Sequence, residues 1–510
     1  MLKEHYLYKK NFTKTSDYTV WLGFPGPYSF SLSSLGFLWL YKSIDENTNI
    51  QIERICSDTE LSYKKLPDMF GFSFSFDLDF LTIFSMLEKY NIPLKSVDRE
   101  KIIVFAGGPV VSANPEPYKD YFDFFIIGDG EDLNLKAVEI CQKTNEKSKA
   151  LKLLSEIDGI YVPIYPKNVK KITKKLSECI YTPILGENAF FKDTFIIEMS
   201  RGCMNRCGFC LASYLNLPLR SVPDKELFEA IDLGLKYTNK IAFLGAQVSA
   251  HPSFSKVCEY IYQKIKSGEN IEMNFSSLRV DAITEKVIKT LVAAGQKSIT
   301  LAIEAGSERL RKVINKNLTE DQIFSAIKIA KIYGLKSVKF YGMIGLPTET
   351  YHDIDEMINL AQKIKKQNKG FDITFGFSSF VPKPNTPFQW IGREDTKSLE
   401  AKSNYIKKEL HKIGVSANIS SIKWDYWQAV LSRGDSSLNE FLFEVYKNGG
   451  KLGAFKSAAK NMSINTDEFA YKNYNFSKVF PWDFIDISPG KEFLISENKR
   501  LLNGSIVTID

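Results

Sequence analysis

Three cysteines stand close together near the middle of the chain, at Cys203, Cys207 and Cys210, in the stretch EMSRGCMNRCGFCLAS. Three thiolates at this spacing suit an iron–sulfur cluster. A cubane [4Fe–4S] cluster has four irons, so three cysteines leave one iron without a protein ligand. That iron can chelate the amino group and the carboxylate of a molecule such as S-adenosylmethionine (SAM). The alternatives are three unrelated cysteines or a zinc site, which would need a fourth cysteine or histidine ligand.

The residues around the cysteines predict a strand that ends in a short loop. The apolar run TFIIEM leads into the motif, and Arg201-Gly202 makes the turn. From residue 193 onward, strand and helix patterns alternate, and six such units suit a partial (β/α)6 barrel, whose active site lies at the C-terminal strand ends. Strands are predicted at 195–199, 241–244, 271–275, 298–303, 337–343 and 373–380, and helices at 225–237, 253–266, 285–294, 320–333 and 354–366.

With this cysteine motif and barrel pattern, the sequence resembles the radical SAM superfamily. The resemblance implies a [4Fe–4S] cluster on Cys203, Cys207 and Cys210, with SAM on the open iron. One electron from the cluster then cleaves SAM to a 5'-deoxyadenosyl radical. Phe209 matches the family position beside the adenine.

Further candidates for binding SAM stand at the predicted strand ends. The superfamily often has G-G-E after the second strand, where this chain reads Leu-Gly-Ala-Gln at 244–247, so the glutamate is absent. A carboxylate at Glu304 can bind the ribose hydroxyls or the ammonium of SAM, and an arginine can bind its carboxylate bidentately. The residues around Arg311 fit an exposed first helical turn equally well. The candidates are Gly245, Ala246, Ser276, Arg279, Glu304, Arg311 and Gly345.

The first 160 residues predict a separate α/β domain with a doubly wound, Rossmann-like sheet. Glycine-rich loops follow two of its strands, at 107–109 and 128–131. In such sheets ligands bind beyond the carboxyl ends of the strands, although tight turns use the same residues. Strands are predicted at 18–24, 50–55, 69–74, 102–105 and 123–127, and helices include 78–90 and 131–143.

This order of strands and loops resembles the cobalamin (B12)-binding-type domain that precedes the barrel in one class of radical SAM enzymes. That domain usually carries D-x-H-x-x-G, whose histidine ligates cobalt, and none of the four histidines of this chain stands in such a motif. The resemblance therefore implies cobalamin bound without a protein histidine, or a domain that has lost the cofactor and serves substrate binding. The predicted contacts are Gly107, Gly108, Gly128 and Gly130.

We expect four segments: the cobalamin-binding-type domain at 1–160, a linker at 161–192, the radical SAM core at 193–390 and a mainly helical region at 391–510. Helices in the last region are predicted at 399–413, 437–448 and 491–502. The phrases PKPNTPFQW, SRGD and FPWDFIDISPGKEFL closely resemble one family of uncharacterised radical SAM proteins with an N-terminal cobalamin-binding-type domain.

Composition sets further bounds. The net charge of +7 over 510 residues gives no argument for a nucleic acid or a membrane partner. Residues 18–41 carry no charge, but glycines and prolines interrupt the run, which fits a strand, a turn and a helix start better than a membrane span. The four remaining cysteines are scattered and form no secretory framework, so we expect a cytoplasmic protein.

The sequence thus favours a radical SAM enzyme of unknown substrate, supplied by an electron donor such as flavodoxin or ferredoxin. Two alternatives remain: a cobalamin-dependent radical SAM methyltransferase, and a non-enzymatic iron–sulfur sensor or binding module. Methylthio transfer is disfavoured because those relatives carry a second cluster on three N-terminal cysteines. Here only Cys56, Cys141 and Cys179 precede the motif, widely spaced.

Overall fold

The computed structural model describes residues 4–11, 13–59, 65–144 and 146–502. Its N-terminal region is a six-stranded sheet of order β3-β2-β4-β5-β6-β7, parallel throughout except for antiparallel β7. This confirms the predicted doubly wound α/β sheet, whose central strands are apolar on both faces. The strands are β2 (Thr19–Phe24), β3 (Gln51–Cys56), β4 (Met69–Ser73), β5 (Ile103–Gly107), β6 (Phe124–Ile126) and β7 (Ile160–Tyr161).

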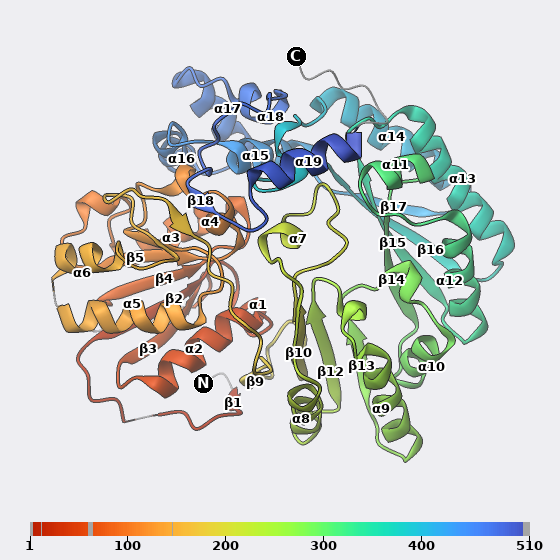
Figure 1. Cartoon of the computed structure of the whole chain (residues 1–510), viewed down its shortest axis with the longest axis horizontal. Helices are drawn as coiled ribbons and strands as arrows, with labels where there is room; N and C mark the ends of the chain where they lie inside the picture. The colour runs from red at the N-terminus through yellow and green to blue at the C-terminus, as the bar shows by residue number, and fades with distance from the viewer. Residues whose placement is uncertain (1–3, 12, 60–64, 145, 503–510) are drawn as a thin grey trace.

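Both faces of this sheet are covered (Figure 1). One face packs on α2 (Leu35–Asn47), α5 (Glu131–Thr144) and α6 (Lys147–Leu154). The other packs on α3 (Phe80–Lys89), on α4 (Pro109–Ala113) and on helices from the C-terminal end of the chain. The C-terminal helices therefore complete the core of the N-terminal sheet.

The strand order reverses at β2, which pairs with both β3 and β4. The glycine-rich loops follow β5 and β6 at the same carboxyl edge of the sheet, the edge at which doubly wound sheets bind ligands. Gly108 has φ 121°, and a Cβ on it would lie 2.6 Å from the Phe74 carbonyl oxygen. Gly128 has φ 101°, and a Cβ on it would lie 2.2 Å from the Ile172 carbonyl oxygen. Both positions therefore require glycine.

The central region is a partial barrel made of two four-stranded sheets (Figure 1). Their orders are β11-β10-β12-β13 and β14-β15-β16-β17, and an isolated bridge between Leu278 and Leu301 joins them. Strand β17 (Ser416–Ile419) pairs in parallel with β16, so the barrel sheet extends into the region that the sequence predicts as mainly helical. The other strands are β10 (Thr194–Arg201), β11 (Arg220–Ser221), β12 (Lys240–Gly245), β13 (Glu272–Phe275), β14 (Ser298–Glu304), β15 (Ser337–Ile344) and β16 (Asp372–Ser379).

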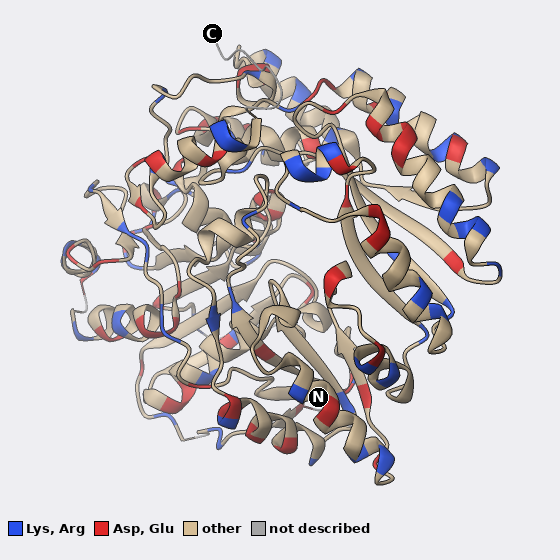
Figure 2. Ribbon diagram, turned by 45° about the vertical axis from the view of Figure 1, so that its right-hand side comes forward, with Lys and Arg blue, Asp and Glu red and all other residues tan. Residues whose placement is uncertain are grey.

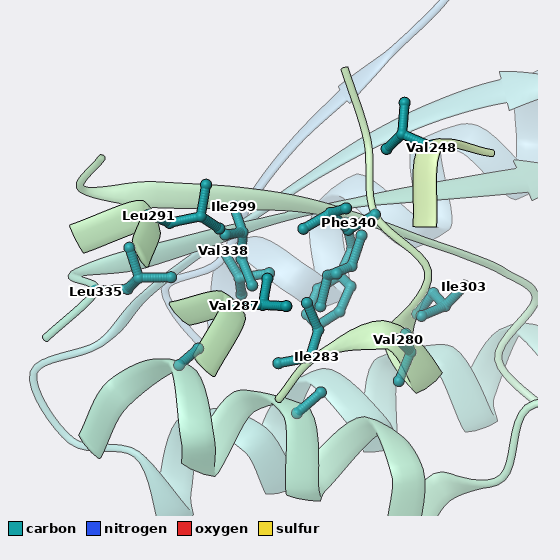
Figure 3. Packing of buried hydrophobic residues seen from close by; sticks show 14 of the residues in the cluster. Val248, Val280, Ile283, Val287, Leu291, Ile299, Ile303, Leu335, Val338 and Phe340 are labelled. Carbon is teal, nitrogen blue, oxygen red and sulfur yellow. The ribbon is translucent and has the colours of Figure 1, made fainter. Parts of the chain in front are cut away.

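Alternation along the strands separates the barrel core from the lumen. In β15, Val338 and Phe340 are buried towards the outer helices, whereas Lys339 and Tyr341 are exposed. Figure 3 shows Val338 and Phe340 packed with Val287, Leu291 and other apolar side chains of this core. The outer helices are α8 (Asp224–Leu235), α9 (Phe254–Lys266), α10 (Glu285–Ala293), α12 (Glu320–Ile332) and α13 (Tyr351–Gln367).

The C-terminal helices lie along the top of Figure 1 and link the two regions. Asp77 of the N-terminal region accepts bonds from Lys383 Nζ at 2.7 Å and from Ser432 Oγ at 2.9 Å, so the PKPNTPFQW and SRGD segments hold this junction. The helices are α14 (Thr396–Lys412), α15 (Ile422–Arg433), α16 (Leu438–Lys447), α17 (Leu452–Asn461), α18 (Thr466–Tyr471) and α19 (Lys491–Leu502). Within the described ranges, we find no helix that is long and apolar enough to span a membrane.

The predicted linker contains short strands that pair with distant segments. Strand β8 (Val169–Lys170) pairs with β18 (Ile485–Asp486), and β9 (Ile184–Gly186) pairs with β1 (Glu4–Tyr6). The linker is therefore tied to both ends of the described chain.

Candidate functional site

Strand β10 delivers the cysteine loop to the carboxyl edge of the barrel. Gly202 has φ 83°, and a Cβ there would lie 2.5 Å from the Asn216 carbonyl oxygen, so the turn before the first cysteine requires glycine. Cys203 and Cys207 are buried and Cys210 is half-buried. All three line one cavity of about 200 Å³. The structure thus brings the three predicted metal ligands together.

The thiols lie among polar groups. Asn205 Nδ2 is 3.3 Å from Cys203 Sγ, and Gln247 Oε1 is 3.2 Å from the same sulfur. Cys207 Sγ lies 3.9 Å from the Asn315 carbonyl oxygen. Burial raises the pKa of the Cys207 thiol to about 12, so metal binding must displace its proton.

The arrangement of the donors bears on which metal centre fits. In the described part of the chain, no three His, Cys, Asp or Glu side chains converge closely enough to hold a single metal ion. A structural zinc site needs four ligands around one ion, whereas three thiolates of a [4Fe–4S] cluster each take a different iron. The cysteine cavity is lined by three thiols and, among the described residues, by no fourth cysteine and no histidine, so its donor set fits a cluster on three thiolates better than a structural zinc site.

Glu304 lies at the end of β14, where the register with β15 shifts between Ala302 and Glu304. Its φ is 63°, a conformation that costs a non-glycine residue free energy and that often occurs at functional sites. Its carboxylate is 3.1 Å from the ammonium of buried Lys316. Both residues line the cysteine cavity, as do Gln247 and Arg279. The cavity thus offers a carboxylate, an ammonium, a guanidinium and an amide beside the thiols.

The other predicted SAM-binding residues fall in four groups. Phe209 and Ala246 line the cysteine cavity, and Gly245 lines a larger neighbouring cavity. Ser276 is exposed, and its neighbour Ser277 lines the cysteine cavity in its place. Two further residues, Arg311 and Gly345, have structural contacts.

Arg311 is buried, and its guanidinium donates to the carbonyl oxygens of Leu318 at 2.7 Å, Ala305 at 2.9 Å and Gly306 at 2.7 Å. These hydrogen bonds connect the loops before and after α11 (Glu308–Val313). Gly345 has φ 72° in a turn, and its N–H donates to Glu349 Oε1 at 2.8 Å.

A second cavity of about 630 Å³ lies in the barrel lumen. It shares Phe209 and Glu304 with the cysteine cavity, so the two adjoin. Tyr341, Phe377 and Asn418 also line it. Asn418 belongs to β17, so the C-terminal region contributes to this wall.

A third cavity, of about 590 Å³, lies between the carboxyl edge of the N-terminal sheet and the start of the cysteine loop. The four predicted glycines line it, and so do Arg201 and Gly245 of the barrel. Two buried oxygens on its wall, Glu131 Oε2 and Ser200 Oγ, have no hydrogen-bond partner among the described residues. No histidine is among the described residues that line it. The glycines Gly107, Gly108, Gly128 and Gly130 are thus brought to one face of this cavity.

Arg201 joins the two sides of this cavity. Its guanidinium forms ion pairs with Glu198 at 2.8 Å, Asp129 at 3.1 Å and Glu131 at 2.5 Å. Arg220 contacts Asp129 at 2.5 Å. Although burial raises the pKa of Asp129, the two guanidinium groups outweigh it and hold that pKa below its usual range. The acidic residues of the second glycine-rich loop therefore pair with the barrel.

Sequence reasoning missed several of these residues. Lys316 is 12 residues from Glu304 in a loop after α11, and no motif indicates the pairing. The sequence predicts only a turn at Arg201, and its partners Asp129 and Glu131 lie in another region of the chain. Their opposite charges beside two predicted strand ends were the available signal.

Two family models match the chain. The Radical SAM superfamily model matches residues 197–361, and the model for the N-terminal region of radical SAM proteins matches residues 36–163. An uncharacterised protein of Methanocaldococcus jannaschii is 33% identical over 381 residues, which cover 72% of this chain and 80% of that protein. An uncharacterised methyltransferase of Pyrococcus horikoshii is 25% identical over 375 residues, which cover 69% of this chain and 76% of that protein.

Among solved structures, the chain is similar to TsrM from Kitasatospora setae, a radical S-adenosylmethionine methyltransferase with cobalamin and a [4Fe–4S] cluster bound. The TM-score is 0.55 at 10% identity, and the match covers 88% of this chain and 99% of that one. At this identity the likeness shows a shared fold across both the N-terminal region and the barrel.

Proposed function

Since the chain belongs to the radical SAM superfamily, an enzyme family that uses a [4Fe–4S] cluster and SAM, we propose that Cys203, Cys207 and Cys210 hold the cluster. We further propose that the enzyme acts on a substrate in the barrel lumen. The observation that supports this most is the single cavity lined by the three thiols together with Arg279, Glu304 and Lys316. When bound, the cluster supplies the electron that cleaves SAM to a 5'-deoxyadenosyl radical.

The charged residues of the cavity match the charges of the amino-acid end of SAM. The Glu304 carboxylate can accept hydrogen bonds from the ammonium of SAM, and Arg279 and Lys316 can donate to its carboxylate, all as charge-assisted bonds. Phe209 stands between this cavity and the lumen cavity. Its ring therefore lies where SAM and a substrate would meet. Tyr341 and Asn418 would then contact the substrate.

Anaerobic reconstitution with iron and sulfide, followed by mass spectrometry for 5'-deoxyadenosine, tests this proposal. Changing any of the three cysteines to Ala should remove the cluster absorbance and all SAM cleavage. Cys179→Ala and Cys258→Ala are matched controls, because both thiols are buried and neither lines the cysteine cavity. Full iron content in Cys207→Ala would refute the ligand assignment.

A second candidate function is cobalamin-dependent methyl transfer, with residues 1–160 holding the cofactor, 161–192 as a linker and 193–390 as the SAM core. The 590 Å³ cavity favours it, because it lies at the edge where doubly wound sheets bind ligands. The unpartnered oxygens of Glu131 and Ser200 can accept hydrogen bonds from the amide side chains of a corrin. When bound, cobalamin would carry the methyl group, without a histidine of this chain on cobalt.

An anaerobic titration with hydroxocobalamin tests this second candidate. Micromolar binding with a base-off spectrum supports it, and Gly108→Val, which places a side chain against the Phe74 backbone, should abolish it. If 5'-deoxyadenosine forms while cobalamin does not bind, methyl transfer from cobalamin is ruled out and the first candidate remains.

A further inference from the structure

We propose that the barrel lumen binds a small-molecule substrate that carries a flat ring and, at one end, an anionic group. The inference deepens the proposed function and rests on it, because it names the class of molecule on which the radical acts. Two side chains of β15 carry the argument: Tyr341 stacks on the ring, and Lys339 binds the anionic group. Both are exposed on the lumen face, since their neighbours Val338 and Phe340 are buried towards the outer helices.

The strand register surrounds Lys339 with hydroxyl groups. Lys339 pairs with Thr300 of β14 on one side and with Thr374 of β16 on the other. Thr374 pairs in turn with Ser416 of β17. Neighbouring strands lie about 5 Å apart, and all three hydroxyl residues are half-buried or exposed, so this lower row opens to the lumen. One ammonium and three hydroxyls on adjacent strands can together donate several hydrogen bonds to an anionic group.

The charge of the lower row is positive and uncompensated. Within the described ranges, the Lys339 ammonium forms no ion pair, whereas Lys240 on β12 pairs with Glu272 at 3.9 Å. On strand β16, Asp372 pairs with Ser337, two residues before Lys339, and is not an ion-pair partner of that lysine. On the outer helices both signs alternate (Figure 2). An unpaired ammonium in the lumen therefore favours a substrate with an anionic group.

The row above Lys339 provides a place for a ring. Tyr341 pairs with Ala302 of β14 and with Gly376 of β16, so only small residues flank its ring. A Cβ on Gly376 would lie 3.4 Å from Tyr341 Cδ1 and 3.4 Å from Lys339 Cε, so both side chains lie beside this glycine. Tyr341 is 40% exposed, and the Lys339 ammonium is 4.9 Å from its ring centroid. The ring can therefore stack on a flat group while the ammonium binds the anionic end of the same molecule.

The depth and size of the lumen cavity set the length of the substrate. Glu304, which lines both the lumen cavity and the cysteine cavity, pairs with Gly342, three residues after Lys339. At about 3.3 Å per residue, the lower row lies about 10 Å from the level of Glu304. Tyr341 and Gly376 line the lumen cavity, and its volume of about 630 Å³ is typical of small-molecule sites. A molecule about 10 Å long can thus hold its anionic end on Lys339 and place its other end beside the cysteine cavity.

Calorimetric titration of the full, cluster-loaded chain tests the inference with three probes that share one ring system: 1-naphthyl phosphate, 1-naphthoate and uncharged 1-naphthamide. Both anionic probes should bind wild type more tightly than the amide, and the tighter one identifies the anionic group as phosphate or carboxylate. Lys339→Gln should weaken both anionic probes roughly tenfold at low salt and leave the amide unchanged. Lys339→Arg should restore most of that loss, because it keeps the charge. Tyr341→Ala should weaken all three probes roughly fivefold.

Lys328→Gln is the matched control, because Lys328 is an exposed lysine on the outer helix α12. This variant should bind all three probes like wild type. Equal affinity of wild type for the anionic probes and the amide, or an equal effect of Lys339→Gln on all three, would overturn the inference. The titration requires no SAM cleavage. If wild type binds the anionic probes through Lys339 but forms no 5'-deoxyadenosine with dithionite, the proposed function fails while the anion-binding site stands.

Discussion

Arg201 is the residue whose replacement tests most directly how the N-terminal region and the barrel are held together. Its guanidinium is shared by Glu198, Asp129 and Glu131, and the four side chains are only 11–15% exposed. Arg201→Gln removes the positive charge and leaves three carboxylates in place. Asp129 still pairs with Arg220, so Glu131 and Glu198 are the carboxylates that lose their ion pair. Breaking a buried ion pair from one side costs about 3–5 kcal/mol, and with one carboxylate still paired we expect about 3 kcal/mol.

Guanidinium chloride unfolding of the cluster-free chain measures this cost, because loss of the cluster cannot then contribute. Glu131→Gln and the double variant complete a double-mutant cycle, in which we expect a coupling free energy above about 1 kcal/mol. Arg201→Lys should fall between wild type and Arg201→Gln, since an ammonium keeps the charge but not the planar fork. A change below about 0.5 kcal/mol in Arg201→Gln, the range of ordinary surface substitutions, would refute the reasoning.

Three further predictions follow from the same structure. Glu304→Gln should weaken SAM binding, measured by titration of the cluster-loaded enzyme, by roughly 10-fold or more, the lower end of what a lost charge-assisted hydrogen bond costs; unchanged affinity would assign Glu304 a structural role with Lys316. Gln247→Glu should tighten SAM binding roughly fivefold, because a charged acceptor beside the cluster site binds an ammonium more strongly than an amide does, and weaker binding would contradict this. Burial raises the pKa of Asp79 to about 6, above its usual 3.8, so the folded chain holds this proton more tightly than the unfolded chain does. The free energy of unfolding is therefore highest below pH 3.8 and falls as the pH rises to 6. The free energy of unfolding of Asp79→Asn, measured by denaturant titration, should therefore rise by about 1–2 kcal/mol relative to that of wild type between pH 4 and pH 7. A difference between the two proteins that does not change with pH would argue against this.

The helices and strands could be predicted from the sequence where a local pattern of apolar residues determines them. The parallel strands carry long apolar runs, and the observed bounds of β2, β4 and β14 lie within one residue of the predicted ones. Strand β17, with the sequence SANI, was missed because two of its four residues are polar, and its pairing with β16 determines its conformation. Helix α15 was missed because its tryptophans indicated burial without a clear helical period.

The residues of the candidate site also differ in whether the sequence alone could predict them. The cysteine spacing is a local signal, so the sequence alone could identify the three thiols. Lys316 and Arg201 act through partners that are distant in the chain, and only the fold brings them into contact. Arg311 shows the reverse case: its charge suggested a ligand, but its hydrogen bonds go to backbone carbonyl oxygens.

The wall between the cysteine cavity and the cavity of the N-terminal region has a feature that bears on both proposed functions. Ala246 lines both cavities, and so does Ala212, which follows the third cysteine by two residues. Only two methyl side chains stand at this wall, and a larger side chain at either position would thicken it. The two cavities therefore adjoin at these two alanines. Gln247, at the position where the superfamily often has glutamate, turns its oxygen towards Cys203, so the acceptor is retained on the cysteine side while the other side stays open. Direct transfer of a group between two bound molecules, which the second candidate function involves, would need cavities that adjoin in this way.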